Sequence, residues 1–253
     1  MRVCIVIPVY NHEHAVKITV AEVRKHGVSV ILVDDGSGET CAAELRKITA
    51  ADSGLELLRL PINQGKGGAV MAGLLRASQL GFTHALQIDA DGQHDAGLVP
   101  TFVSTALSHP TSMICGEPRF DFSIPRHRFY LRYLTHLMVW LNTLSLDIKD
   151  SMCGFRVYPL SIVLPVIESE RPGRRMDFDI EILVRLHWRG VPMQWIPSRV
   201  SYPADGVSHF RLIRDNALLT ILQIRLLFGM LRRLPRLLGR RLQTVFAPAG
   251  ESR

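Results

Sequence analysis

The chain has 253 residues, of which 47% are hydrophobic and 21% are charged. These proportions are typical of a globular protein and exclude a disordered chain. The formal net charge of +7 favours an anionic partner, such as a nucleotide, a nucleic acid or an acidic membrane. No stretch reaches the roughly 18 apolar residues of a membrane-spanning helix. The first apolar run is short and is broken by Pro8, which excludes a signal peptide.

The cysteines are scattered without C-x-x-C spacing, at Cys4, Cys41, Cys115 and Cys153. This pattern predicts buried thiols in a reducing compartment and excludes a zinc site or a disulfide framework. We therefore expect a cytoplasmic protein.

Strands and helices alternate regularly along the first 90 residues. The pattern predicts strands over 3–9, 28–33, 55–60 and 84–88, and helices over 15–25, 40–50 and 70–79. This alternation predicts an α/β fold with a Rossmann-like, mostly parallel central sheet that is flanked by helices. Such sheets bind ligands at the carboxyl ends of their strands.

Two carboxylates, Asp89 and Asp91, end the fourth expected strand. Two carboxylates this close repel each other, and Mg²⁺ or Mn²⁺ would relieve the repulsion while phosphate oxygens and water complete its coordination. Gln93 could add a carbonyl oxygen and His94 a nitrogen. The alternative is that Asp89 caps the next helix and Asp91 lies in a solvated turn.

Polar residues also follow the second and third expected strands. Asp35 could accept a hydrogen bond from a base or a ribose. In the glycine-rich segment 63–69, Lys66 would place a positive charge near phosphates, or would simply be a solvated lysine in a flexible turn. This segment is not a Walker A motif, and no G-x-G-x-x-G follows the first strand. These absences exclude a P-loop and a Rossmann dinucleotide site.

Four short motifs occur in the order and at the spacing of one enzyme family. They are Ile7-Pro8-Val9-Tyr10-Asn11, Val33-Asp34-Asp35-Gly36-Ser37, Asn63-Gln64-Gly65-Lys66-Gly67 and Asp89-Ala90-Asp91-Gly92-Gln93. Together they resemble the nucleotide-sugar half of family 2 glycosyltransferases, the inverting group with the GT-A fold. The resemblance implies a GT-A domain over 1–211. Its nucleotide-sugar half would be 1–116, where the resemblance is close, and its acceptor half 117–211.

The resemblance implies that the motif residues bind the nucleotide sugar: Pro8, Tyr10, Asn11, Asp34, Asp35, Asn63, Lys66, Asp89 and Ala90. Pro8 and Tyr10 would line the base pocket, and Asp35, alone or with Asp34, would contact the nucleoside. Many relatives have Glu where this chain has His12, which leaves UDP and GDP both open. Asp89, Asp91 and Gln93 would hold Mg²⁺ or Mn²⁺ on the diphosphate.

The second half is less regular. The pattern predicts helices over 98–108, 129–144 and 176–189, a strand over 112–116 and two short strands within 191–201. Three arginines follow the strand at 112–116: Arg119, Arg128 and Arg132. We expect them to bind an anionic lipid head group. Residues 150–156 resemble the D-x-x-x-G-F-R segment of polyprenyl-phosphate sugar synthases, which adds Arg156 to the expected acceptor site.

Some related lipid-modifying enzymes have an Asp, taken as the catalytic base, where this chain has Gly154. Either the acceptor needs little deprotonation, as a phosphate would, or another carboxylate is the base. The candidates are Asp150, Asp177, Asp179 and Glu181. Asp177 and Glu181 could equally have a structural role, because a negative charge near the N-terminus of a helix interacts favourably with the helix dipole. Residues 202–211 resemble a loop that closes over the diphosphate, where His209 or Arg211 would neutralise the departing nucleotide. The expected catalytic residues are Asp91, Asp150, Asp179 and Arg211.

Residues 212–253 combine an apolar run over 216–230 with the arginines that follow it, and Pro235 is expected to break the helix. The pattern predicts amphipathic helices that lie on an anionic membrane. The alternative is a helix packed on the core with a solvated basic end. No aromatic platform supports nucleic-acid binding. We expect a peripheral protein on the cytoplasmic face of the inner membrane.

The sequence thus predicts a metal-dependent inverting glycosyltransferase that uses a nucleoside-diphosphate sugar and a membrane lipid acceptor, first of all polyprenyl phosphate. An alternative acceptor is a hydroxyl of a lipid or of an aryl-polyene-like molecule, since residues 202–206 resemble a segment of glycosyltransferases associated with aryl-polyene pigments. A nucleotidyltransferase and a non-catalytic lipid- or nucleotide-binding module also remain open. The sequence does not predict an oligomeric state.

Overall fold

The computed structural model describes the backbone of residues 1–120, 126–200 and 212–246, and the side chains of these ranges except at 120, 126–131, 212–216 and 241–246. The strands are β1 (Val3–Val9), β2 (Ser29–Asp34), β3 (Leu55–Arg59), β4 (His84–Gln87), β5 (Met113–Phe120), β6 (Arg156–Pro159) and β7 (Met193–Val200). The helices are α1 (Ala15–Arg24), α2 (Glu39–Ala51), α3 (Lys66–Gln79), the 3₁₀ turn η1 (Ala96–Leu98), α4 (Val99–Ser108), α5 (Arg126–Thr143), α6 (Leu160–Glu170), α7 (Phe178–Trp188) and α8 (Leu212–Phe246).

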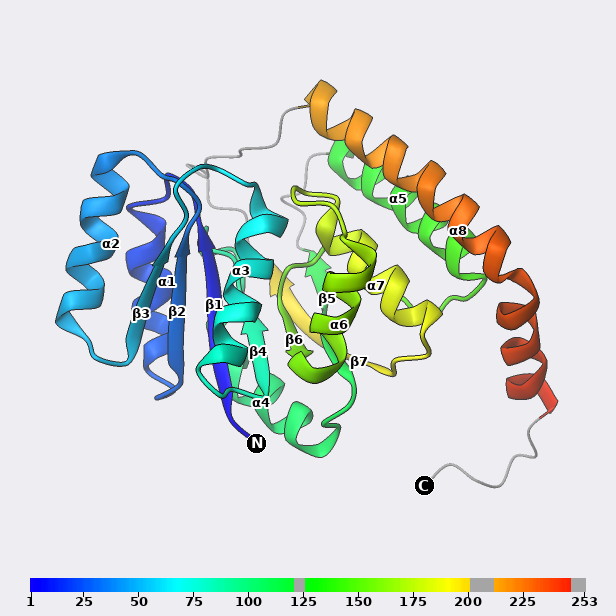
Figure 1. The fold of residues 1–253 in the computed structure, drawn as a ribbon, viewed down its shortest axis with the longest axis horizontal. Coiled ribbons are helices and arrows are strands. Elements are labelled where there is room, and N and C mark those ends of the chain that lie inside the picture. The colour runs from blue at the N-terminus through cyan, green and yellow to red at the C-terminus, as the bar shows by residue number, and fades with distance from the viewer. Residues whose placement is uncertain (121–125, 201–211, 247–253) are drawn as a thin grey trace.

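Within the described residues, seven strands form one sheet in the order β3-β2-β1-β4-β6-β5-β7. Strand β6 runs antiparallel to its neighbours β4 and β5, and the other pairings are parallel. Figure 1 shows the sheet at the centre of the molecule with helices packed around it. The predicted mostly parallel α/β fold is therefore confirmed.

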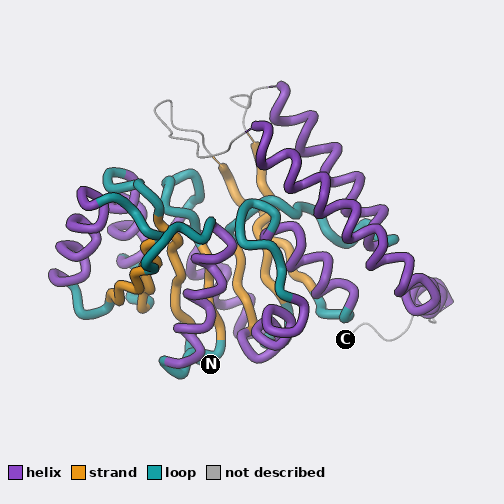
Figure 2. Tube along the Cα trace, turned by 45° about the horizontal axis from the view of Figure 1, so that its top comes forward, coloured by secondary structure: helices purple, strands orange, loops and turns teal. Residues whose placement is uncertain are grey.

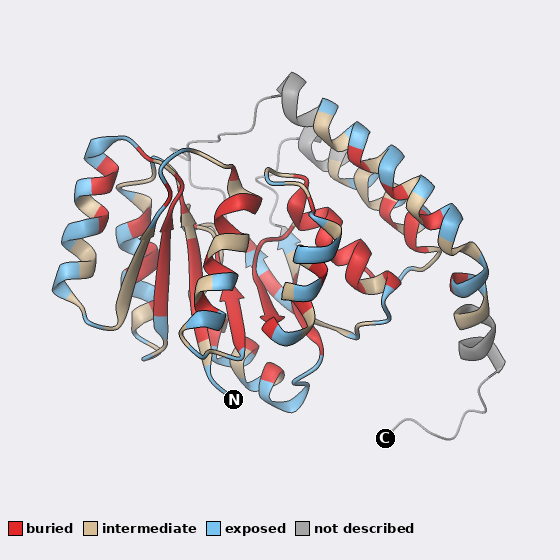
Figure 3. Ribbon diagram, in the orientation of Figure 1, coloured by how far each residue is buried: buried red, intermediate tan, exposed pale blue. Residues whose placement is uncertain are grey.

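Side chains of the central strands alternate between two apolar cores, because successive residues of a strand point to opposite faces. Cys4 and Val6 of β1 pack in the core that includes α3, α6 and α7, whereas Ile5 and Ile7 pack in the core that includes α1 and α4. In Figure 3 the central strands are buried and the exposed residues lie on the outer faces of the helices. The cysteines at 4, 41, 115 and 153 are all buried and free, as predicted.

Two elements of the second half were not predicted. Strand β6 has four residues, which is too short for a periodic signal, and helix α6 contains Pro165, which disfavours a helix interior. The two short strands expected within 191–201 are one strand, β7, and the strand expected over 112–116 extends to Phe120. Helix α3 begins at Lys66 rather than at residue 70, which places this lysine in its first turn.

Helix α8 continues through Pro235, so the predicted helix break is wrong. Met230 and Leu237, which flank the proline, are both buried against the body, and this packing continues across it. Helices α5 and α8 lie side by side along one edge of the molecule (Figures 1 and 2). In the part of the chain that the structure describes, no helix is long and apolar enough to cross a membrane.

Candidate active site

The polar strand ends meet at one edge of the sheet. Strands β1, β2 and β4 are parallel neighbours, so their carboxyl ends lie together. Asp35 follows β2, and its backbone N–H donates to the carbonyl of Val9 at 2.9 Å. Beyond β4, Ile88 N–H donates to the carbonyl of Val6 at 3.2 Å and brings Asp89 to the same edge.

Lys66 joins two carboxylates from different halves of the chain. Its Nζ lies 2.8 Å from Asp89 Oδ2 and 2.9 Å from Asp179 Oδ2. Burial lowers the pKa of Lys66, but the two carboxylates outweigh burial and hold that pKa above its ordinary value. Burial raises the pKa of Asp89, but Lys66 and the nearby His94 outweigh it and hold that pKa low. Both members of the Lys66–Asp89 pair are therefore charged.

One oxygen of Asp89 is buried without a hydrogen-bond partner. Asp89 Oδ1 is buried and accepts no hydrogen bond from the described residues. Gly154 lies directly against this carboxylate, since a Cβ atom at Gly154 would be 2.8 Å from both of its oxygens. Nearby, burial and the charge of Asp89 raise the pKa of Asp91. A cation would relieve this repulsion between like charges.

The donor set at this position fits Mg²⁺ or Mn²⁺. Two carboxylates and the amide oxygen of Gln93 are oxygen donors, and Mg²⁺ is commonly held by one or two carboxylates while phosphates and water fill its other positions. Among the described residues no group of three or more His, Cys, Asp or Glu side chains could hold a metal alone.

Asp35 organises a segment that we call the donor loop, residues 64–68, which includes the start of α3. Its carboxylate accepts the backbone N–H groups of Gln64 at 2.7 Å and Gly65 at 2.8 Å. Burial raises the pKa of Asp35, which these two hydrogen bonds only partly offset. Asp34 is completely buried and accepts the backbone N–H of Ser37 at 2.8 Å. The expected nucleoside contact of Asp34 stays a prediction.

Two other residues that were predicted to bind the nucleotide sugar, Asn11 and Ala90, make hydrogen bonds within the protein. Asn11 accepts the backbone N–H of Gly38 at 2.9 Å through Oδ1, at the N-terminus of α2. Ala90 is buried in the core, and its carbonyl accepts a hydrogen bond from Thr19 at 3.2 Å. Three predicted contacts are half-buried in this part of the fold: Pro8, Tyr10 and Asn63. Their contact with a nucleotide stays a prediction.

The predicted acceptor arginines have different surroundings. Arg156 is completely buried, and its guanidinium donates to the carbonyls of Asp179 at 2.6 Å and Ser151 at 2.9 Å. These hydrogen bonds fix residues 150–156 against α7, and the expected contact of Arg156 with an acceptor stays a prediction. Arg119 is exposed. The Arg132 guanidinium donates to Asp150 at 2.9 Å.

Two predicted site residues lie outside what the structure describes. They are the side chain of Arg128 and the whole of Arg211, together with its loop at 202–210.

Residues 4–162 match the sequence model of glycosyl transferase family 2. The chain belongs to this family. It is 29% identical over 184 residues to a dolichyl-phosphate beta-glucosyltransferase of Dictyostelium discoideum, and the aligned region covers 67% of this chain and 54% of that protein. It is 26% identical over 190 residues to an undecaprenyl-phosphate mannosyltransferase of Micrococcus luteus, which covers 70% and 76%. The chain thus spans about half the length of the first of these relatives.

Solved structures with the same fold confirm the GT-A prediction. One is glucosyl-3-phosphoglycerate synthase from Mycobacterium tuberculosis in complex with Mn²⁺, UDP-glucose and phosphoglyceric acid, with a TM-score of 0.64, 15% identity and coverage of 90% of this chain and 79% of that one. Another is S. aureus TarS 1–349 with UDP-GlcNAc, with a TM-score of 0.59, 12% identity and coverage of 92% and 72%.

In this family 2 glycosyltransferase, each carboxylate considered as a catalytic base already has partners: Asp150, Asp177, Asp179 and Glu181. Asp150 accepts two backbone N–H groups, at 2.9 and 2.7 Å, besides the guanidinium of Arg132. Asp177 accepts one backbone N–H at 3.0 Å, Asp179 contacts Lys66, and Glu181 pairs with Arg185 and Arg225. These contacts favour structural roles and leave the base unassigned.

Sequence reasoning missed Gln87 of β4. Its Oε1 accepts a hydrogen bond from Tyr158 at 2.8 Å, and its Nε2 lies 3.5 Å from Asp179 Oδ1. Burial raises the pKa of Tyr158, so its hydroxyl stays protonated and donates. A glutamine inside an apolar strand was the available signal, because a buried amide needs partners.

Replacing Lys66 by Met is expected to lower the free energy of unfolding by about 3 kcal/mol, because it removes the closest cation from two largely buried carboxylates. Urea unfolding measures the change. The control is Lys47→Met on exposed α2, which should alter stability by less than about 0.5 kcal/mol. Equal stability of the two variants would contradict the proposed ion-pair arrangement.

Proposed function

We propose that this protein transfers a sugar from a nucleoside-diphosphate sugar to polyprenyl phosphate, with inversion at the anomeric carbon. One observation carries the proposal: Asp89 Oδ1 lies at the sheet edge without a hydrogen-bond partner among the described residues, while the four carboxylates considered as a base have partners. Such a site suits an acceptor that arrives already ionised. The names of the Dictyostelium and Micrococcus relatives, which specify dolichyl phosphate and undecaprenyl phosphate, support this acceptor class.

On the donor side, Asp89, Asp91 and Gln93 would hold Mg²⁺ or Mn²⁺. Bound there, the cation would neutralise charge on the diphosphate leaving group. The Mn²⁺ in the complex of the mycobacterial synthase supports a divalent cation. Asp35 would contact the nucleoside, and Lys66 would keep positive charge close to the phosphates. Both remain proposals, as does the choice between UDP and GDP.

On the acceptor side, a phosphate monoester carries about −1.5 to −2 charges at pH 7. Its oxygen can therefore attack the anomeric carbon, on the face opposite the leaving group, without a protein base. Arg119 and Arg132 would attract its charge. A hydroxyl of a lipid or of an aryl-polyene-like acceptor would require deprotonation, and the four carboxylates considered as a base all have other partners.

We also propose that α5 and α8 rest on an anionic membrane surface, so that residues 212–253 form a membrane-associating segment beside a donor half, 1–116, and an acceptor half, 117–211. Both helices expose apolar side chains at helical spacing: Leu134, Leu137 and Leu141 on α5, and Ile221, Ile224, Phe228, Leu231 and Leu238 on α8. Arg232 and Arg236 are exposed on α8 near these residues. A peripheral position on the cytoplasmic face of the inner membrane would follow.

Some arginines of α8 contact the body of the protein, whereas Arg232 and Arg236 are exposed. Arg225, Arg233 and Arg240 contact the body of the protein, at Glu181, at Glu170 and at the carbonyls of His187 and Trp188. These three arginines therefore hold α8 against the body of the protein. The opposite, apolar face of α8 remains exposed.

Replacing Ile224 and Phe228 together by Glu is expected to weaken binding to phosphatidylglycerol-containing vesicles by at least about tenfold, since burial of each side chain is worth about 1.5–3 kcal/mol. Vesicle flotation measures this affinity. The control is Leu107→Glu on α4, which is equally exposed but lies on neither helix. Equal binding by both variants would contradict docking through α8.

The function is tested by incubating the purified protein with a panel of UDP- and GDP-sugars, Mn²⁺ or Mg²⁺ and extracted membrane lipid. We expect one donor to release its nucleoside diphosphate in a reaction that needs metal and lipid. Release of pyrophosphate would instead identify a nucleotidyltransferase. Binding of a nucleotide sugar without turnover under any lipid would favour a non-catalytic module.

A further inference from the structure

The donor loop packs against a second loop, residues 173–175, which joins α6 to α7. The backbone N–H of Gly68 donates to the carbonyl of Arg174 at 2.8 Å, and the Arg174 guanidinium donates to Gln64 Oε1 at 2.8 Å. The fit is close, because a Cβ atom at Gly65 would lie 2.6 Å from the Arg174 carbonyl oxygen, and one at Gly67 would lie 2.9 Å from the carbonyl carbon. Loop 173–175 and the donor loop are therefore closely packed and joined by hydrogen bonds.

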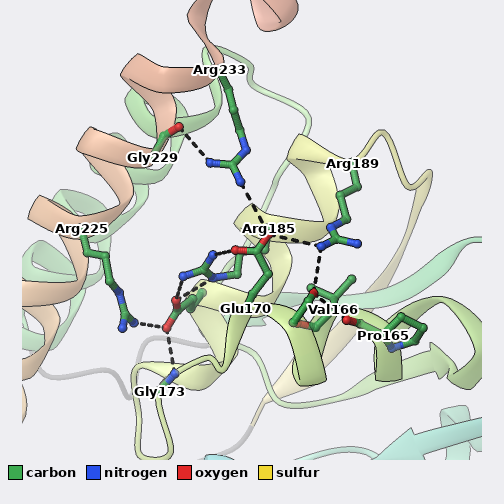
Figure 4. Close-up of polar contacts among 11 residues, drawn as sticks. Pro165, Val166, Glu170, Gly173, Arg185, Arg189, Arg225, Gly229 and Arg233 are labelled. Carbon is green, nitrogen blue, oxygen red and sulfur yellow. Dashed lines mark hydrogen bonds and ion pairs between the residues drawn. The ribbon is translucent and has the colours of Figure 1, made fainter.

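Glu181 of α7 holds loop 173–175 in place. This side chain is completely buried, and its Oε2 accepts the backbone N–H of Gly173 at 2.8 Å. The same oxygen pairs with Arg225, which reaches across from α8, while Oε1 accepts Arg185 Nε at 2.7 Å. Figure 4 shows Arg225 extending from α8 toward Gly173 and Arg185. One carboxylate oxygen thus joins α8 to the loop that supports the donor loop.

We propose that Glu181 and Arg225 are positioning residues for the nucleotide-sugar site. The Arg225 guanidinium fixes the carboxylate of Glu181, which fixes Gly173. Loop 173–175 in turn holds the amides of the donor loop, where Asp35 accepts two of them. Both positioning residues lie outside the donor loop. The inference rests on the proposed function only in taking the donor loop to bind the nucleotide.

Arg233 provides a matched comparison within the same helix. It also extends from α8 to a glutamate of the body, with Nη2 3.5 Å from Glu170, and its guanidinium lies over the ring of Trp188. Its side chain is 36% exposed, against 45% for Arg225. Glu170 ends α6 and pairs with arginines of α7 and α8 and with Arg189, which follows α7. Arg233 therefore secures α8 through a glutamate other than the one that holds Gly173.

The test compares Arg225→Gln with Arg233→Gln in the full chain. Amide hydrogen exchange, followed in peptides that contain residues 64–68 and 173–175, needs no ligand. We expect Arg225→Gln to accelerate exchange at the Gly68 amide by about tenfold and Arg233→Gln to leave it unchanged. Equal acceleration in both variants would overturn the inference, because α8 would then act only through general stability. No acceleration in either would overturn it as well.

Binding of UDP and GDP in the presence of Mn²⁺, measured by calorimetry, provides the second readout. Arg225→Gln and Glu181→Gln should weaken binding of the preferred nucleotide by at least about fivefold, and Arg233→Gln should not. Wild-type protein that binds neither nucleotide would contradict the proposed function but leave the exchange result decisive for the positioning role. Wild-type binding with equal affinity in the three variants would overturn the positioning role alone.

Discussion

Asp91→Asn is expected to lower kcat/KM for sugar transfer by about a thousandfold. The substitution keeps the shape of the side chain but removes one of the two carboxylates that would hold the divalent cation. Stabilisation of a leaving group by a metal ion is worth several kcal/mol, and each 1.36 kcal/mol corresponds to about tenfold in rate. The release of nucleoside diphosphate from the preferred donor, followed over a range of Mn²⁺ concentrations, measures the effect.

Asp95→Ala is the control for this prediction. Asp95 is exposed, and its carboxylate accepts the backbone N–H of Gly97 at the start of η1. Its loss should cost about 1 kcal/mol of stability, as for other caps, and leave kcat/KM within twofold. Wild-type turnover by Asp91→Asn, with unchanged dependence on Mn²⁺, would refute the assignment of Asp91 to the metal.

Gly154→Ala is expected to lower kcat by about a hundredfold while the fold is retained. The added Cβ would lie 2.8 Å from both carboxylate oxygens of Asp89 and from Gln87 Nε2, so the carboxylate must shift. A displacement of this size at a reacting centre commonly costs about 10²-fold in rate. Single-turnover assays at saturating donor measure the effect, and circular dichroism checks the fold.

Gly239→Ala on α8 is the matched control. A Cβ atom there would meet nothing within 4 Å. The exchange of glycine for alanine within a helix should stabilise the protein by about 0.5–1 kcal/mol and leave kcat unchanged. If Gly154→Ala turned over like the wild type, the close approach of Gly154 to Asp89 would have no functional meaning. That outcome would also show that position 154 has room for a side chain, such as the Asp that some related enzymes have there.

The sequence predicted the donor half well because its signals are local. Each strand that ends in polar residues does so within a few positions of its own apolar run, as Asp35 and Asp89 illustrate. Parallel pairing then brings these ends together without further information. The alternation of short strands with helices was sufficient to predict the mostly parallel sheet.

Long-range pairing explains what the sequence did not show. Arg156 reads as a free cation in the sequence, but its partners belong to α7 and to residue 151. The link from Lys66 to Asp179 spans more than a hundred positions, and no local pattern encodes it. Helix α8 crosses Pro235 because tertiary packing on both sides outweighs a local preference. Such contacts depend on the folded arrangement of elements that are distant in sequence.

The most direct test of the central claim offers the enzyme two acceptors that differ in one group, polyprenyl phosphate and the corresponding polyprenol, with the preferred labelled nucleotide sugar and Mn²⁺. We expect label to enter the lipid fraction only with polyprenyl phosphate, in a product that mild acid cleaves at the glycosyl phosphate. Transfer to polyprenol, with an acid-stable product, would contradict the claim of a phosphate acceptor that needs no protein base.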